Sequence, residues 1–402
     1  MIPLKLNYNY KDIFLAPKIA LSGKKIFMLI KGNLFGYILY FICSTISILT
    51  TGMNIEDTIS KYGLYPYLFG HQAEWYSWII YFFGVAIWLF TILVTSTGVS
   101  RILLKQLKGD DFYSGKDAWE FIYKYWQAVV LAPISILSII ISFFLLSFIF
   151  ASVGKIPLIG TITFPLLYIF YFFGSIFTIL SIFVFFSSLL YVPSIVGIYE
   201  EDTMGSVFQT YAIFFSQTSR VFLYNILLGA LLVISVELFS WICFSSMGLI
   251  SYIFGDKFFM GNQFSTLNSF SISIVFPTEI LDTLIFFKTY IFEKLHIDFN
   301  ISLFFDTLFK DTELKNLSII ETISSVILSI IYFVIGLSIF SYGLSILSVG
   351  QSLMFVIFKK LSDHDDIISR SDGDFESDSL IIQNNFDSNF MNPSNLILDE
   401  EE

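Results

Sequence analysis

Six long apolar runs constrain this chain more than any other feature of its sequence. A run of about 18 or more apolar residues is long enough to cross the hydrocarbon core of a bilayer as an α-helix. The runs predict an all-α fold, namely a polytopic bundle of about six transmembrane helices in an integral membrane protein. They cover residues 34–51, 78–97, 128–150, 164–191, 221–250 and 319–349.

The composition and the distribution of charge support the same prediction. Charged residues make up 14% of the chain and hydrophobic residues 55%, whereas about a quarter of a soluble domain is charged. Residues 361–402 contain 12 acidic residues and one arginine, so they carry the whole net charge of −11. We predict a transmembrane domain over residues 1–361 and a disordered acidic cytoplasmic tail over residues 362–402. The balanced charge of the remainder gives no indication of nucleic-acid binding.

The lysines and arginines beside the apolar runs predict the orientation in the membrane. Residues 1–31 contain six lysines, and five basic residues lie between the second and third runs. The two short connections on the opposite side contain only Lys61 and Lys155. Because short cytoplasmic loops carry the excess of Lys and Arg, we expect both termini to lie in the cytoplasm.

Two stretches between the runs have one apolar face but are too polar to insert as spans. Residues 114–127 begin with Ser114, a favourable N-cap, and interleave aromatic with charged side chains. Residues 277–296 place their apolar residues on one stripe of a helix. We expect each stretch to lie along the membrane surface or, equally, to pack across the top of the bundle.

The prolines near the ends of runs are expected to set the entry geometry of a helix without interrupting it; they are Pro133, Pro165 and Pro193.

One acidic residue lies well inside an apolar run. Glu237 is flanked by Ile234, Leu238 and Trp241, and an ionisable side chain at membrane depth is a functional candidate because its burial is costly. The competing interpretation is structural: near the outer end of a tilted helix, Glu237 would reach headgroup water or accept a hydrogen bond from a hydroxyl. No second ionisable group at this depth completes a proton relay, which favours the structural interpretation.

The last apolar run carries small residues on two faces. Ser329, Gly336, Gly343 and Gly350 recur at seven-residue intervals, and a set of serines lies on roughly the opposite face. Small residues let neighbouring helices approach closely, so we expect this helix to be packed between two others at the centre of the bundle. A pore or substrate pathway is the competing interpretation. The serine set comprises Ser338, Ser341, Ser345 and Ser348.

The sequence contains no signature of an enzyme. His71, His296 and His364 are scattered without metal-ligand spacing. A glycine-rich phosphate loop and a GxSxG nucleophile turn are both absent from the sequence. Cys43 and Cys243 lie within apolar runs, as small buried apolar residues do. We therefore expect no catalytic residue, no cofactor and no metal site.

The junction after the fourth run resembles that of a group of bacterial membrane proteins. The chain reads Val192-Pro193-Ser194-Ile195-Val196, followed by Glu200, Glu201 and Asp202, an amphipathic stretch and Arg220. The sequence GKIPLIG at residues 154–160 resembles their short extracytoplasmic turn. Residues 114–235 are thus similar to uncharacterised six-span bacterial inner-membrane proteins that resemble the membrane domain attached to some glycerophosphodiester phosphodiesterases. The resemblance implies the cell inner membrane and a six-helix fold. It implies no activity, because this sequence contains no phosphodiesterase domain.

Two functions fit these observations. The first is a non-enzymatic membrane module that binds or organises membrane lipid or a partner protein. The second is a small-solute permease or channel subunit that uses Glu237, although transporters usually carry several polar groups or interrupted helices at membrane depth. The acidic tail is expected to be solvated and repelled from anionic lipid; docking of a basic cytoplasmic partner is the alternative.

Overall fold

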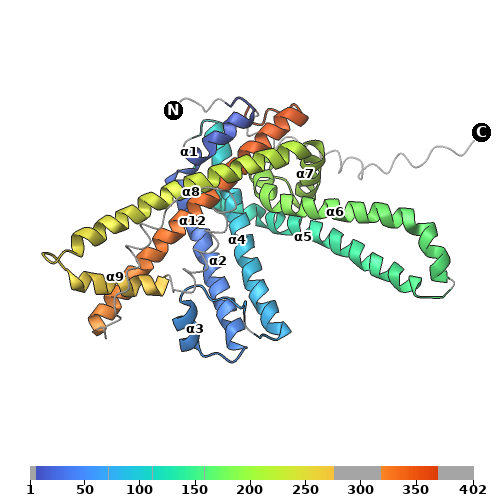
Figure 1. Ribbon diagram of the computed structural model, residues 1–402. Coiled ribbons are helices and arrows are strands. Elements are labelled where there is room, and N and C mark those ends of the chain that lie inside the picture. The colour runs from blue at the N-terminus through green and yellow to red at the C-terminus, as the bar shows by residue number, and fades with distance from the viewer. Residues whose placement is uncertain (1–5, 71, 111, 158, 276–317, 370–402) are drawn as a thin grey trace, which may run out of the picture.

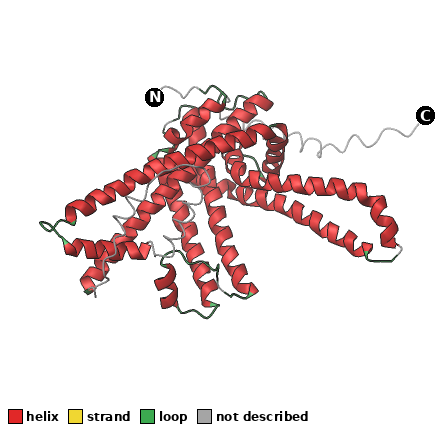
Figure 2. Cartoon of the chain, viewed as in Figure 1, coloured by secondary structure: helices red, strands yellow, loops and turns green. Residues whose placement is uncertain are grey.

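The fold is all helical throughout the part of the chain that the structure describes (Figure 2). The computed structural model describes residues 6–70, 72–110, 112–157, 159–275 and 318–369. The predicted acidic tail beyond residue 369 and the predicted helix over residues 277–296 lie outside these residues. The helices, in chain order, are η1 (Tyr10–Leu15), α1 (Ala16–Ala20), α2 (Gly23–Leu49), α3 (Ile55–Tyr62), α4 (Trp75–Leu107), α5 (Gly115–Gly154), α6 (Ile159–Tyr199), α7 (Thr203–Ser216), α8 (Thr218–Phe254), α9 (Asn262–Val275) and α12 (Ile319–Ser362).

Six of these helices are long and apolar enough to cross a membrane: α2, α4, α5, α6, α8 and α12. The prediction of an all-α, multi-pass membrane protein with six spans is confirmed. The helices continue well beyond the apolar runs, mostly at one end of the molecule. For example, α4 extends to Leu107 and α12 to Ser362. These extensions meet at one end of the molecule, at the top of Figure 1, and we call this end the base. It comprises residues 6–31, 98–110, 112–125, 190–225 and 345–369.

The base contains the largest core in the described part of the chain, and α12 runs through its centre. Every residue from Val349 to Lys359 is buried, because α1, α2, α4, α6 and α8 all pack against α12. A helix that is buried on all faces belongs to the core of a bundle. The N-terminal elements also reach this core, since Ile13 and Leu29 are fully buried in the same cluster as Phe355.

The amphipathic stretch over residues 114–127 is not a separate interfacial helix. It forms the first turns of α5, which runs unbroken from Gly115 to Gly154. Ser114 is the N-cap, as predicted: its Oγ accepts a hydrogen bond from the Asp117 N–H, and the Asp117 carboxylate accepts one from the Ser114 N–H. No helix-breaking residue separates this stretch from the apolar run, so the helix continues. Its buried face, with Phe121 and Ile122, packs into the base.

The three prolines lie inside helices, and the expectation that they sit at helix entries was wrong. Pro133 falls within α5, and Pro165 and Pro193 fall within α6. A transmembrane helix accommodates proline when neighbouring helices and local adjustments satisfy the freed backbone groups. Pro133 and Pro193 are buried against other helices, where such support is available.

Three arms diverge from the base (Figure 1). The first contains α2 and α4, with the short α3 beside the far end of α2. The second is the hairpin of α5 and α6. The third contains α8, α9 and the first half of α12. The arms therefore share contacts at the base and separate toward their far ends.

The α5–α6 arm, defined here as residues 144–157 and 161–176, is the most exposed part of the described chain. Every residue in these two ranges is exposed or half-exposed. The two helices of the arm contact each other, for example through the Phe150 and Tyr171 rings, whose centroids lie 5.6 Å apart. Apolar side chains thus cover all faces of this hairpin.

In the third arm, α9 packs between α8 and α12. At the base, α8 packs directly on α12, and a Cβ added at Gly350 would lie 2.3 Å from the Leu228 Cδ1. Farther along the arm the two helices separate, and α9 fills the space between them. Met247 of α8, Ile272 of α9 and Tyr332 of α12 share one hydrophobic cluster there. We did not predict α9, because its residues lie in the connection between the fifth and sixth apolar runs and include several Asn and Ser residues.

Candidate functional site

Glu237 lies near the middle of α8 and is half-buried. Its neighbours Val236 and Phe239 face α12: the Phe239 and Tyr342 ring centroids are 4.9 Å apart, and Val236 lies against Gly343. Ile234 and Leu238 are exposed on the outer side of α8. Glu237 is therefore at the edge of the contact between α8 and α12, close to where the two helices begin to separate.

The small residues of α12 face two different helices. Gly343 and Gly350 lie against α8, where an added Cβ would come within 3.2 Å and 2.3 Å of Val236 and Leu228 side-chain atoms. Ser329 faces α9 and donates a hydrogen bond to the Ser271 carbonyl at 3.2 Å. Gly336 lies between these two contacts, and an added Cβ there would meet no atom within 4 Å.

The serine set on the other face of α12 contacts the first helices of the chain. The Ser345 hydroxyl donates to the Ala20 carbonyl at 3.0 Å, and the Ser341 hydroxyl accepts from the Asn33 side-chain amide at 3.2 Å. Ser338 and Ser348 donate to carbonyls of their own helix, four residues earlier. In the structure, α12 thus lies between α8 and α9 on one side and α1 and α2 on the other.

Hydrogen-bonded polar side chains join α4, α6, α8 and α12 where the base meets the arms, and we call this set of residues the seam. Sequence reasoning missed it. Gln351 of α12 donates to the Asn225 side-chain oxygen at 2.6 Å, and Asn225 of α8 donates to the Tyr191 hydroxyl of α6 at 2.8 Å. Beside them, the Ser352 hydroxyl lies 2.8 Å from that of Ser100 and 3.1 Å from that of Ser194. The signal was available in the sequence, because carboxamides at the edge of or inside an apolar run need polar partners.

The ion pair of Arg101 and Glu200 links α4 to the end of α6 and, through Tyr125, to α5. The Arg101 Nη2 lies 2.6 Å from the Glu200 Oε1, and the Tyr125 hydroxyl donates to the other carboxylate oxygen at 2.9 Å. The Arg101 guanidinium also lies over the Phe121 ring at 4.7 Å. Glu200 has a backbone φ of +59°, a left-handed conformation that costs a non-glycine residue about 1 kcal/mol or more. The pair holds Glu200 in this conformation at the junction between α6 and α7.

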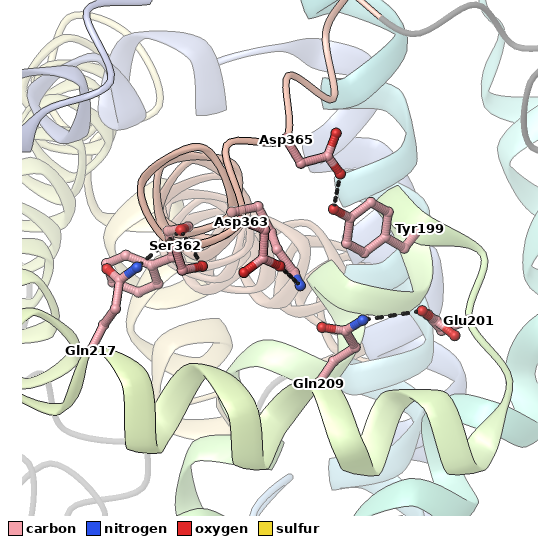
Figure 3. A network of polar contacts seen from close by, with 9 residues as sticks. Tyr199, Glu201, Gln209, Gln217, Ser362, Asp363 and Asp365 are labelled. Atoms are coloured by element: carbon pink, nitrogen blue, oxygen red, sulfur yellow. Dashed lines mark hydrogen bonds and ion pairs between the residues drawn. The ribbon is translucent and has the colours of Figure 1, made fainter.

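A short segment after α12 folds back onto the base, so the prediction that the disordered tail begins at residue 362 was wrong for these residues. We call residues 363–367 the latch. Figure 3 shows the Tyr199 hydroxyl donating to Asp365 of the latch. Lys359 pairs with Asp363. Asp366 pairs with Lys360 at 3.0 Å and accepts from the Tyr8 hydroxyl at 2.9 Å. Ile367 is fully buried in the core of the base. The latch therefore joins the N-terminal elements to the end of α12.

These contacts shift the pKa values of the latch residues. The hydrogen bond from Lys359 lowers the pKa of Asp363, and that from Lys360 lowers the pKa of Asp366. Burial, reinforced by the hydrogen bond to Asp366, raises the pKa of Tyr8 to about 12. The ionised carboxylates and the neutral phenol are thus the forms that the folded base stabilises.

The polar groups described above make hydrogen bonds and ion pairs between helices, and their arrangement supports a role in holding the helices together. Within residues 6–70, 72–110, 112–157, 159–275 and 318–369, no three His, Cys, Asp or Glu side chains gather as a metal site would require. Cys43 and Cys243 are free thiols in α2 and α8. A comparison with protein families, with curated proteins and with solved structures finds no match to this chain.

Proposed function

We propose that the chain is a non-enzymatic membrane module that organises membrane lipid, or a partner membrane protein, around arms held by a packed base. The α5–α6 arm carries the proposal. Its apolar side chains are exposed on all faces, with Phe148 at 68% and Phe170 at 70%. An extended apolar surface of this kind marks contact with a membrane or a partner.

Lipid is the better-supported occupant of the arm. The exposed side chains are mostly Phe, Ile and Leu, whereas interfaces between transmembrane helices are enriched in Gly, Ala, Ser and Thr. Bulky, branched side chains suit contact with disordered acyl chains, and they keep another helix at a distance. A partner protein is the alternative occupant.

The location proposed for this module is the bacterial inner membrane, with both termini in the cytoplasm. The lysine distribution supports this orientation, and so does the hydrogen bond between Tyr8 and Asp366, which brings the two ends of the described chain to one side. In this orientation the acidic tail is also cytoplasmic, and a basic protein is its candidate partner.

Affinity purification in a mild detergent tests the proposal, with mass spectrometry of retained lipids and co-purifying proteins. The double variant Phe148→Ala/Phe170→Ala should lose retained lipid, or a specific protein, relative to the unmodified chain. Phe258→Ala is the matched control, because Phe258 is 92% exposed but lies in the turn between α8 and α9. An arm variant that retains the same lipids and proteins as the unmodified chain and the control would refute the proposal.

A further inference from the structure

One face of α2 forms a continuous exposed stripe at helical spacing. Lys24, Phe27 and Lys31 occupy the end of the stripe near the base. The rest of the stripe is apolar and comprises Phe35, Ile38, Ile42 and Ile46. From Lys24 to Ile46 the helix rises by about 33 Å, which is close to the thickness of the hydrocarbon core. The stripe therefore places positive charge at one membrane interface and apolar side chains across the remainder.

The two lysines are directed toward the interface. The Lys31 ammonium lies over the Phe27 ring, 4.6 Å from its centroid, so its side chain runs back along the helix toward the base. This is the direction in which a lysine extends to bring its charge out of the hydrocarbon. Lys24, two turns closer to the base on the same face, donates to the Tyr113 carbonyl at 3.3 Å. Within the described residues, Lys31 forms no ion pair with a carboxylate.

A different face of α2 packs against α4 and has the small residues typical of a contact between helices. Gly32 and Gly36 lie there, and an added Cβ would come within 2.1 Å of Thr95 and 2.7 Å of Trp88 on α4. The small residues are thus used for contact with α4, whereas the exposed stripe has none. A surface of Phe and Ile bordered by lysine fits an acyl chain below an anionic headgroup better than it fits a second helix.

We propose that an anionic phospholipid of the leaflet beside the base binds along this stripe of α2. Its phosphate lies against the Lys31 ammonium, and its acyl chains lie along Phe35, Ile38 and Ile42. The inference deepens the proposed function by naming a lipid class, but it uses a surface separate from the α5–α6 arm.

The test is headgroup selectivity in a bilayer of defined composition. The full chain is placed in nanodiscs with equal amounts of phosphatidylcholine and phosphatidylglycerol, and native mass spectrometry counts each lipid that stays bound after release. Lys31→Gln should lower the enrichment of phosphatidylglycerol about fivefold, the effect of one lysine near an anionic surface, while Lys31→Arg should preserve it. Lys116→Gln is the matched control, because Lys116 is 84% exposed on α5 and is paired with Glu120 at 3.9 Å.

Equal enrichment in the unmodified chain and in Lys31→Gln, with Lys116→Gln also unchanged, would overturn the inference. A dimer of the unmodified chain that Ile38→Ala dissociates would also overturn it, because the stripe would then be an interface between copies. Failure of this inference can be told apart from failure of the proposed function. If the proposed function is wrong, Phe148→Ala/Phe170→Ala retains the same total lipid and protein as the unmodified chain, whatever the ratio of lipid headgroups in Lys31→Gln.

Discussion

At the scale of single residues, the pair of Arg101 and Glu200 has the clearest structural consequence. Arg101 lies in α4 and Glu200 directly follows α6, and their side chains are 11% and 26% exposed. Removing one charge leaves the other partly buried without its partner, which costs more than the loss of a solvent-exposed pair. Stability at the base should therefore depend on this pair.

We predict that Glu200→Gln destabilises the protein by about 1–3 kcal/mol. The midpoint of thermal unfolding in detergent measures the effect. Glu120→Gln, which removes the exposed pair with Lys116, should change stability by less than about 0.5 kcal/mol. Equal effects of the two substitutions would show that Arg101 and Glu200 do not support the base.

Glu237 separates the two candidate functions. If the chain organises lipid, Glu237→Gln should leave retained lipids and proteins unchanged, because the substitution preserves shape and removes only charge. If the chain is a permease, the same variant should reduce solute flux in proteoliposomes. A flux that depends on Glu237 would therefore favour transport over the function proposed here.

Sequence reasoning located single residues well where the signal was local and poorly where it was distant. Ser114 was identified as an N-cap from its position alone, and Glu237 from its charge inside an apolar run. The pairing of Arg101 with Glu200 joins positions 99 residues apart, and no local pattern specifies such a contact. Asn225 and Gln351 carried a readable signal, since carboxamides in an apolar context need partners, but their partners again lie far away in the sequence.

At the scale of helices, α6 is packed closely at one end and free at the other. Near the base, a Cβ added at Gly197 would lie 2.7 Å from the Thr97 carbonyl oxygen of α4. In the arm, a Cβ added at Gly174 would meet no atom within 4 Å. One helix therefore offers a matched pair of glycines for comparing base and arm.

We predict that Gly197→Ala destabilises the protein by about 1–3 kcal/mol, because the backbone of α4 cannot move away cheaply. Gly174→Ala should be neutral or stabilising by up to about 1 kcal/mol, since alanine favours the helix. Thermal unfolding of the two variants in the same detergent measures the difference. A destabilising Gly174→Ala would mean that the arm is covered by protein.

The latch should hold within a window of pH. Asp363 and Asp366 have lowered pKa values, so their contribution is present above about pH 4 and is lost as the pH falls below that value. Tyr8 has a pKa raised to about 12, so its contribution is complete below about pH 10 and is lost as the pH rises toward 12.

A spin label at Ser369→Cys, with both native cysteines replaced by serine, reports the state of the latch. The label should be immobile near neutral pH and should become mobile at either extreme. Asp366→Asn should increase mobility at neutral pH, because it removes the charge that Lys360 binds. A label whose mobility does not change with pH or with this substitution would contradict the role assigned to the latch.

The sequence predicted which helices exist better than where they end. Each of the six apolar runs corresponds to one long helix, because run length reports the membrane directly. The extensions into the base were missed, since amphipathic turns of α5 resemble a separate surface helix. The short α9 was missed because its Asn and Ser residues read as a loop, whereas in the structure Asn268 accepts a hydrogen bond from Tyr332 and Ser271 donates one to the Ser325 carbonyl.

At the scale of the whole molecule, the base and the arms have different physical requirements. The base is closed by its own core, its seam and its latch. The α5–α6 arm projects away from the base (Figure 1), and its apolar side chains are exposed along both helices. A helical hairpin satisfies its own backbone hydrogen bonds, so it needs no further protein around it in a bilayer. This division supports a module that is rigid at one end and surrounded by other membrane components at the other.

Site-directed spin labelling along α6 tests that division most directly. Labels at Ile169, Phe170, Phe172 and Phe173 in liposomes should all be accessible to oxygen dissolved in the bilayer, because these exposed residues lie on the side of α6 away from Tyr171, which contacts α5. Labels at Ile195, Val196 and Ile198, in the base, should be protected. Protection of any of the four arm labels from oxygen would contradict the account, because the side of α6 that faces away from α5 would then be packed against further protein.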